Sequence, residues 1–214
     1  MMKKILAIGS HPDDIELGCS GTLLRHKENG DEVSLLVLTG GEASGDPDVR
    51  EIECRESAKA LDADNLIFGK LPDTKISDGF ETISLIENVL DQLNPDIVYT
   101  QCYKDTHQDH RNAGYATLSA ARRVDKILMY ESPTTFKEFN PQMFIDIQQQ
   151  FERKKEIIRI FKSQSNKKWW SIGSRSAIAL EGLAYYRGFQ SGLYVAEAFE
   201  IFRYVYHKDE KVSF

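Results

Sequence analysis

Cysteine is scarce in this sequence. Only three of its 214 residues are cysteine, Cys19, Cys54 and Cys102, and no two of them form a CxxC pair. Secreted domains that are held together by disulfides carry many cysteines in even number, so this class is excluded. Scattered thiols fit the reducing cytoplasm, and Cys54 is expected to be a small buried residue on a helix.

A long hydrophobic run is also missing. The first apolar stretch covers only residues 5–8 before polar residues follow. This stretch is too short for the core of a signal peptide, and no later segment could span a bilayer. We therefore expect a cytoplasmic protein that does not act at a membrane.

Positive charge is not concentrated anywhere in the chain. Lysine and arginine number 27 against 33 aspartates and glutamates, which gives a formal net charge of −6. Proteins that bind nucleic acid neutralise phosphates with clustered basic side chains, and no such block is present. The composition argues against a nucleic-acid partner and favours a small molecule.

The sequence also lacks a phosphate-binding loop. Residues 18–23, GCSGTL, contain two glycines but lack the G-x-x-x-x-G-K-[ST] spacing of a nucleotide site. A Gly-rich loop followed by a suitably spaced acid, as in dinucleotide-binding folds, is not found either. We interpret Gly18 and Gly21 as positions where the first helix packs closely against its surroundings.

The pattern that is present is an alternation of apolar runs and helical periods. It predicts strands at residues 4–8, 32–39, 65–68, 96–101 and 126–131, and helices at 21–28, 50–61, 81–93, 112–124, 145–162 and 177–187. Continuous apolar strands that alternate with helices predict a doubly wound, mostly parallel, Rossmann-like α/β sheet with helices on both faces. No linker interrupts the chain, so residues 1–214 are expected to form a single domain.

Histidine and aspartate gather directly after two of the predicted strands. They are His11, Asp13 and Asp14 in SHPDD, and His107, Asp109 and His110 in YKDTHQDH. Ligands of open parallel sheets collect at the carboxyl ends of the strands, so the topology can bring the two segments together. Two histidines and one carboxylate form a common ligand set for catalytic zinc. A spare acid beside such a set can act as a base.

Each motif has a structural alternative. SHPDD could be a turn whose aspartate caps the next helix, and HQDH could be a helix N-terminus with surface histidines. The presence of both motifs after strands of one sheet favours a shared metal site. Histidine and aspartate accept several divalent ions, so these residues leave the identity of the metal open.

The chain resembles the PIG-L/LmbE family of zinc-dependent N-deacetylases. The paired motifs AIGSHPDDIELGCSGTL and HQDHRNAG carry the resemblance, and REIECRESAKAL, GKLPD, YESP and YYRGFQSGLYVAEAF resemble further blocks of the family. The last block is most similar to bacterial members that act on glucosamine conjugates, including the bacillithiol-pathway deacetylases. The resemblance implies a deacetylase fold over most of the chain.

The resemblance also implies roles for individual residues. His11, Asp14 and His110 match the family's zinc ligands, with one ion per chain; another divalent metal such as Fe²⁺ remains open. Asp13 matches the general base. His107 matches the histidine that stabilises the developing oxyanion.

Two further roles concern the substrate and its surroundings. Arg50 matches an arginine associated with sugar binding, and Asp109 lies where a carboxylate could orient His107 or tune its pKa. The implied reaction removes the N-acetyl group from an N-acetylglucosamine conjugate, and a homo-oligomer is expected. Two alternatives remain: a deacylase or deformylase of another amide, and a non-catalytic member that binds metal or sugar.

Two segments carry no assigned role. The loop that contains Gly40 and Gly41 is expected to lie near the site, although an ordinary turn with positive φ would explain its glycines equally well. Trp169 and Trp170 could stack on a sugar ring, form an oligomer contact or anchor the C-terminal region.

Overall fold

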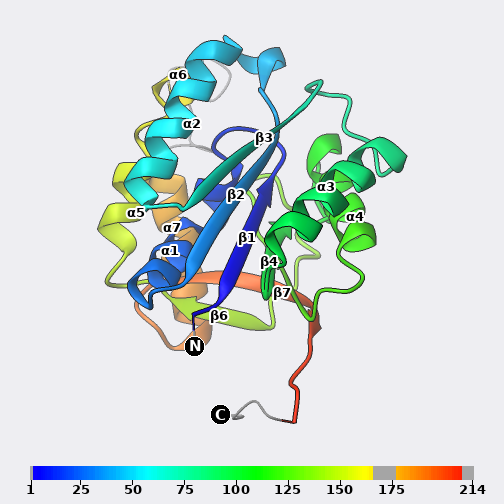
Figure 1. Cartoon of the computed structure of the whole chain (residues 1–214). Coiled ribbons are helices and arrows are strands. Elements are labelled where there is room, and N and C mark those ends of the chain that lie inside the picture. Colours follow the sequence, from blue (N-terminus) through cyan, green and yellow to red (C-terminus); the bar gives the residue numbers. More distant parts are fainter. Residues whose placement is uncertain (1, 166–176, 209–214) are drawn as a thin grey trace.

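The computed structural model describes residues 2–165 and 177–208. Trp169 and Trp170 lie outside these residues. The described strands form one seven-stranded sheet in the order β3-β2-β1-β4-β5-β7-β6 (Figure 1). The strands are β1 Lys4–Gly9, β2 Glu32–Thr39, β3 Asn65–Leu71, β4 Ile97–Gln101, β5 Lys126–Tyr130, β6 Met143–Asp146 and β7 Ala196–Tyr204. Strands β1 to β5 are mutually parallel, whereas β7 runs antiparallel to both β5 and β6.

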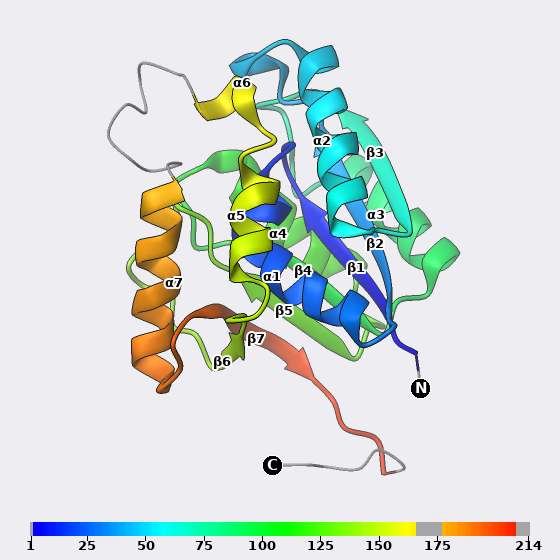
Figure 2. The same ribbon diagram turned by 90° about the vertical axis from the view of Figure 1, so that its left-hand side faces the viewer.

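Helices cover both faces of this sheet, as the alternating pattern predicted. They are α1 Asp14–Glu28, α2 Pro47–Leu61, α3 Phe80–Leu93, α4 Gln108–Ala120, α5 Phe151–Ile158, α6 Lys162–Ser165 and α7 Ala177–Ser191, with the short 3₁₀ helix η1 Glu42–Ser44. Helices α3 and α4 lie on one side, and α1, α2 and α5 lie on the other (Figure 1). Helix α5 lies between α2 and α7 over α1 (Figure 2). Among the described residues, no helix is long and apolar enough to cross a bilayer.

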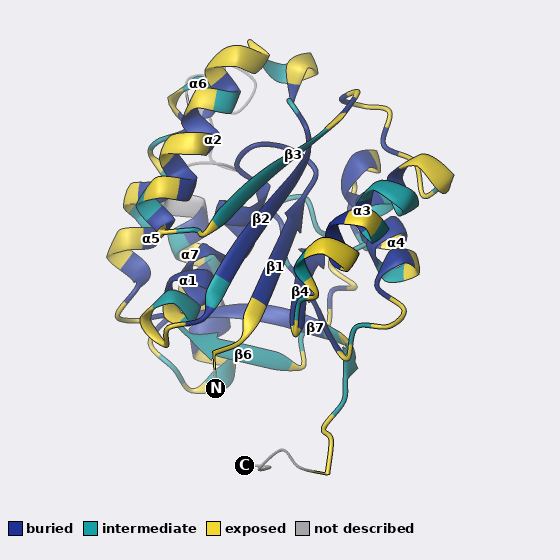
Figure 3. Ribbon diagram, in the orientation of Figure 1, coloured by how far each residue is buried: buried dark blue, intermediate teal, exposed yellow. Residues whose placement is uncertain are grey.

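The central strands are buried on both faces, which explains their continuous apolar sequence (Figure 3). Ile5 and Ala7 of β1 belong to the core beneath α1, α2 and α5. Leu6 and Ile8, which point the other way, belong to the core beneath α3 and α4. Cys54 of α2 is fully buried, as predicted.

The helix predicted at residues 145–162 is correct only over Phe151–Ile158. Ile145 belongs to β6, where it pairs with Glu197 of β7, and the helix starts only at Phe151. The backbone of residues 143–146 forms its hydrogen bonds with β7, which is distant in sequence. A helical period in the local sequence cannot reveal such a partner. Four other helices begin earlier than predicted: α1 at Asp14, α2 at Pro47, α3 at Phe80 and α4 at Gln108.

The glycines of α1 allow close packing, as the sequence indicated. A Cβ at Gly18 would lie 2.1 Å from the ring of Tyr130, and one at Gly21 would lie 2.9 Å from Ile147. Tyr130 is itself fixed, because its hydroxyl donates a hydrogen bond to the carbonyl of Ile8. Helix α1 therefore sits on the sheet at a distance that only glycine permits.

We expect Gly18→Ala to lower the free energy of unfolding by about 1–3 kcal/mol, the usual cost of overpacking a core. The matched control is Gly182→Ala on α7, where a Cβ would meet nothing within 4 Å. That exposed substitution should raise stability by about 0.5–1 kcal/mol, since it removes only the entropic cost of a helical glycine. Urea denaturation of both variants measures the difference, and equal effects at the two positions would contradict the packing argument.

Candidate active site

The candidate site forms where two neighbouring parallel strands end. Strands β1 and β4 pair directly, although they are separated in sequence by two strands and three helices. The side chain of Gln101 joins the ends of the two strands. Its amide oxygen Oε1 accepts hydrogen bonds from the backbone N–H of Ser10, at 2.9 Å, and from the Ser10 hydroxyl. The loops that follow carry the two predicted clusters, which the fold brings together.

Three imidazole rings face one another at this point. The ring centroids of His11 and His107 are 4.9 Å apart, those of His11 and His110 are 5.4 Å apart, and those of His107 and His110 are 4.5 Å apart. One nitrogen from each of the three lies within 4.8 Å of the others, a separation suited to a shared metal ion. His11 and His110 are buried, and His107 is partly buried.

Asp14 connects two of these rings. One carboxylate oxygen lies 3.0 Å from Nδ1 of His11, and the other lies 3.4 Å from Nε2 of His110. The contact with His11 follows from the start of α1 at Asp14, since the chain turns back within three residues. The contact with His110 exists only because β1 and β4 are adjacent.

Two acids lie on the far side of His11. Its Nε2 is 3.0 Å from Asp73 and 3.2 Å from Asp109. Asp73 was not among the predicted site residues, although it follows β3 in the segment LPD just as the other acids follow their strands. The Asp109 carboxylate contacts His11 and the backbone N–H of Thr74. The sequence predicts that Asp109 orients His107 or tunes its pKa. Burial lowers the pKa of His107 and the Asp109 carboxylate acts in the opposite direction, whereas the hydrogen bond that Nδ1 of His107 accepts comes from the Asp109 backbone N–H.

A further acid holds His110. Nδ1 of this ring is 3.1 Å from Asp105, a fully buried residue of the loop between β4 and α4. A carboxylate only accepts hydrogen bonds, so this contact requires the proton of His110 to sit on Nδ1. By the same reasoning, the acids at Nε2 of His11 require its proton there.

Nδ1 of His11 also contacts a carboxylate, that of Asp14, so a divalent ion bound there would take the place of the proton on this nitrogen. The two lone pairs available to such an ion are then those of Nδ1 of His11 and Nε2 of His110. Both of these nitrogens face Asp14, and Nε2 of His110 is buried without a hydrogen-bond partner among the described residues. Two nitrogen lone pairs and a carboxylate that converge in a buried space are donors of the kind that zinc binds. The residues therefore fit a divalent metal ion held by His11, Asp14 and His110.

The charged groups of the site shift one another's pKa values. Burial would raise the pKa of Asp14, but the imidazoles of His110 and His11 hold it well below its usual value. Burial would lower the pKa of His110, but Asp14 and Asp105 raise it to about 9. Asp14 likewise raises the pKa of His11 against the effect of burial. Burial and the two neighbouring rings lower the pKa of His107.

Asp13 has an unusual backbone for an aspartate. It precedes α1 with φ 108°, in the left-handed region that most residues avoid. The preceding carbonyl, that of Pro12, accepts a hydrogen bond from Arg50 at 2.6 Å, and the same guanidinium lies 3.5 Å from the Asp13 carboxylate. Backbone strain of this kind persists where the surrounding contacts over-determine it, which is common at functional sites.

Arg50 is only 1% exposed. Besides its contacts with Pro12 and Asp13, it donates hydrogen bonds to the Gly41 carbonyl and the Ser44 hydroxyl. A Cβ at Gly41 would lie 2.0 Å from the guanidinium, which leaves no space for a side chain. The positive φ of 68° is a second reason for glycine at this position. In this structure Arg50 joins the loop after β2 to the loop after β1, and the loop with Gly40 and Gly41 lies at the site.

We expect Arg50→Met to lower the free energy of unfolding by about 3–5 kcal/mol, because it removes the cation from a buried ion pair. Arg55→Met on the same helix is the control. Arg55 forms an exposed pair with Glu51, and its loss should change stability by no more than about 0.5 kcal/mol. Chemical denaturation of both variants tests this, and similar small losses would show that Arg50 does not clamp the two loops.

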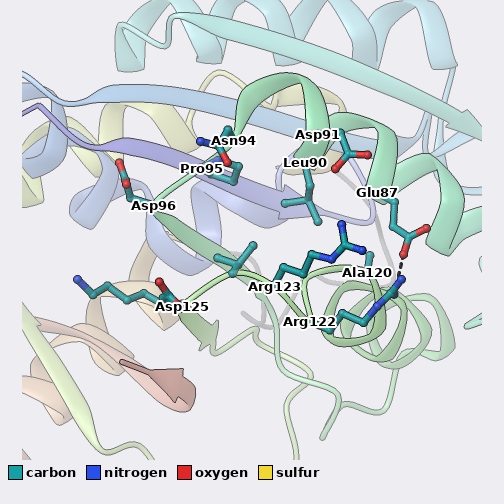
Figure 4. Close-up of a pocket in the computed structure, with 12 residues that line it drawn as sticks. Glu87, Leu90, Asp91, Asn94, Pro95, Asp96, Ala120, Arg122, Arg123 and Asp125 are labelled. Carbon is teal, nitrogen blue, oxygen red and sulfur yellow. Dashed lines mark hydrogen bonds and ion pairs between the residues drawn. The ribbon is translucent and has the colours of Figure 1, made fainter. Parts of the chain in front are cut away.

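A separate cavity of about 660 Å³ lies at the opposite ends of the strands. It lies between the end of α3 and the turn after α4, with Leu90 and Pro95 on one side and Arg122 on the other (Figure 4). Arg122 pairs with Glu87 at 2.6 Å. The cavity lies at the amino ends of β4 and β5, away from the histidines.

The fold and site define an α/β protein with a buried His/Asp cluster where the strand order changes direction. The sequence profile of the family described as "PIG-L: GlcNAc-PI de-N-acetylase" matches residues 6–121. The chain is 36% identical over 156 residues to the uncharacterized deacetylase YaiS of Escherichia coli (strain K12), covering 70% of this chain and 84% of that protein. The chain therefore belongs to the PIG-L family of deacetylases.

Two further relatives extend the similarity over nearly the whole chain. Diacetylchitobiose deacetylase of Thermococcus kodakarensis is 27% identical over 221 residues, covering 92% of this chain and 82% of that protein. The crystal structure of the conserved protein TT1542 from Thermus thermophilus matches with a TM-score of 0.84 and 26% identity, over 99% of this chain and 100% of that one. The β6–β7 region thus belongs to an architecture that relatives share.

Proposed function

We propose that this chain is a metal-dependent N-deacetylase that removes the acetyl group from an N-acetylglucosamine conjugate. The observation that carries the proposal is Asp14, whose carboxylate contacts imidazoles from two strand ends, with a second buried acid, Asp13, next to it in the chain. The family's description and the diacetylchitobiose deacetylase relative support an N-acetylated amino sugar as the substrate class.

His11, Asp14 and His110 would hold the metal ion, which we propose to be zinc. When bound, zinc polarises a carbonyl and lowers the pKa of a bound water towards about 7. The chain supplies two nitrogen lone pairs and one carboxylate, and a set of three protein ligands leaves a coordination position for water or substrate.

Asp13 is the proposed general base. Its carboxylate accepts a proton as water attacks the amide carbonyl, and it then passes this proton to the leaving nitrogen. The carbon–oxygen bond forms first, and the carbon–nitrogen bond then breaks. The products are acetate and a free amino sugar. The guanidinium of Arg50 lies 3.5 Å from this carboxylate.

His107 is the proposed stabiliser of the developing oxyanion. Its Nδ1 accepts a hydrogen bond from the Asp109 backbone N–H, so the proton of the neutral ring is on Nε2. Burial lowers the pKa of His107, which favours this neutral form. A fixed donor aimed at developing negative charge typically contributes about 3–4 kcal/mol to catalysis.

The test is a screen for amine release with zinc-loaded protein. Paired N-acetyl and N-formyl glucosamine conjugates serve as substrates, and the same protein after chelation of its metal is the control. Zinc-dependent amine release from the N-acetyl series supports the proposal. Release from the N-formyl series alone would assign a deformylase, and release from neither series would reject an amino-sugar amide as the substrate.

Two further features stay predictions. We expect a homo-oligomer in the cytoplasm, with an amino sugar as its small-molecule partner. Light scattering of the purified chain measures the mass of the assembly, and a monomer at micromolar concentration would contradict the first expectation.

A further inference from the structure

Asp105 occupies an unusual place among the acids of the site, because it contacts both histidines that follow β4. One carboxylate oxygen accepts a hydrogen bond from the backbone N–H of His107 at 2.8 Å. The other lies 3.1 Å from Nδ1 of His110 and accepts a hydrogen bond from the hydroxyl of Ser132. Asp105 itself is 0% exposed, so its charge is satisfied entirely by these neighbours and by Thr135.

The partners come from two different strand ends. Asp105 and His110 follow β4, whereas Ser132 follows β5 in the segment YESP, next to Glu131. Glu131 is held in turn by Arg187 of α7, through two hydrogen bonds. The Asp105 carboxylate is thus held by the end of the neighbouring strand β5 as well as by its own loop, and it has little freedom to leave His110.

The consequence for His110 is a single tautomer. An ionised carboxylate at Nδ1 requires the proton there and leaves the lone pair on Nε2. That nitrogen is buried, has no hydrogen-bond partner among the described residues, and lies 3.4 Å from Asp14. Without Asp105 the ring could place its proton on either nitrogen, and the tautomer with a proton on Nε2 cannot bind a metal ion there.

We propose that Asp105 is a positioning residue that fixes His110 as the Nδ1–H tautomer with its Nε2 directed at Asp14, and that Ser132 holds Asp105 in this role. The proposal rests on the proposed function only in taking His110 as a zinc ligand. It concerns the chain's own hydrogen bonds, which exist without the metal. Outer carboxylates of this kind typically raise metal affinity about 10–100-fold.

The experiment compares Asp105→Asn and Ser132→Ala with the wild-type chain, and with Asp91→Asn on the exposed face of α3 as the matched control. Zinc affinity is measured with the metal alone, by competition with a chelator. The tautomer of His110 is read from the ¹⁵N chemical shifts of its ring in the metal-free protein at a pH above the ring's pKa of about 9, where the imidazole is neutral. Thermal melting in the absence of metal shows whether each variant is folded.

We expect Asp105→Asn to weaken zinc binding about 10–100-fold and to shift His110 partly to the Nε2–H tautomer, since an amide cannot accept from both histidines. Ser132→Ala should weaken zinc binding less than about tenfold, and Asp91→Asn should change neither quantity. A folded Asp105→Asn variant with wild-type zinc affinity would overturn the proposal. So would one that loses affinity while His110 keeps its tautomer, because that result indicates a purely structural role.

Two outcomes separate this proposal from the proposed function. If the wild-type chain releases no amine but Asp105→Asn shifts the tautomer and weakens zinc binding, the positioning role stands and the deacetylase proposal fails. If Asp105→Asn does not fold, Ser132→Ala decides: unchanged zinc affinity and an unchanged ¹⁵N spectrum of His110 would overturn the positioning role.

Discussion

Replacing Asp13 with asparagine is expected to lower kcat by about 10²–10⁴-fold, the usual contribution of a general base, while the protein keeps its zinc. Zinc should remain because the rings of His11 and His110 both contact Asp14, and because Asp73 and Asp105 hold these rings from their other sides. Asparagine is the appropriate replacement, because among non-glycine residues it is one of the most tolerant of positive φ. Alanine at φ 108° would add backbone strain to the loss of the carboxylate.

The measurement is kcat on an N-acetyl conjugate that the screen has identified, together with the zinc content of the same preparation. Asp91→Asn removes a carboxylate from an exposed position on α3 and should leave both values unchanged. A near-normal kcat for Asp13→Asn with zinc bound would show that another group accepts the proton. Loss of zinc together with kcat would make Asp13 a ligand instead.

Asp14→Ala is expected to abolish zinc binding and, with it, activity. Asp14 contacts both histidines, so its removal leaves two imidazoles with no carboxylate between them. The loss of affinity should exceed the roughly 10–100-fold change that outer residues produce. Alanine is compatible with the backbone, because Asp14 is the first residue of α1.

Thermal melting with and without zinc provides a readout that is independent of turnover. A ligand present at 100 times its dissociation constant stabilises a folded protein by about 2.7 kcal/mol. The wild-type chain should show this stabilisation, and Asp14→Ala should not. A variant that still melts higher in zinc, by as much as the wild type, would mean that the ion is held elsewhere, with the His11, Asp73 and Asp109 group as the next candidate.

The parallel sheet and the position of the site were predictable because both follow from short-range patterns. Continuous apolar runs marked β1 and β4, and polar clusters directly after them marked the strand ends where ligands of such sheets bind. The histidines and aspartates of SHPDD and HQDH stood out because both clusters follow strands of one sheet and together offer the donors of a metal site. The resemblance then supplied the roles, which geometry by itself leaves open.

The residues that the sequence did not reveal are those whose partners are distant in the chain. Asp73 contacts His11 across 62 positions, and nothing in LPD distinguishes it from an ordinary turn. Ser132 reaches Asp105 from another strand end. Arg50 was named from the resemblance, but its burial was not foreseen, because the groups that surround it come from two loops outside its helix, those after β1 and β2. Edge strand β6 was missed for the same reason, since it depends on pairing with β7.

The change of strand order between β1 and β4 brings four strand ends to one site. The proposed metal ligands come from the segments after β1 and β4, up to the first turns of α1 and α4, whereas residues 41–44 and 72–74 reach the same edge from β2 and β3. The β2 and β3 loops are tied to this centre, because Asp73 contacts His11 and because Gly41 and Ser44 hold Arg50 beside Asp13. Sequence variation that keeps Gly41, Ser44 and Asp73 is therefore the kind that can change the rim of the site while its centre stays intact, and the remaining loop positions are the ones for protein engineers to randomise.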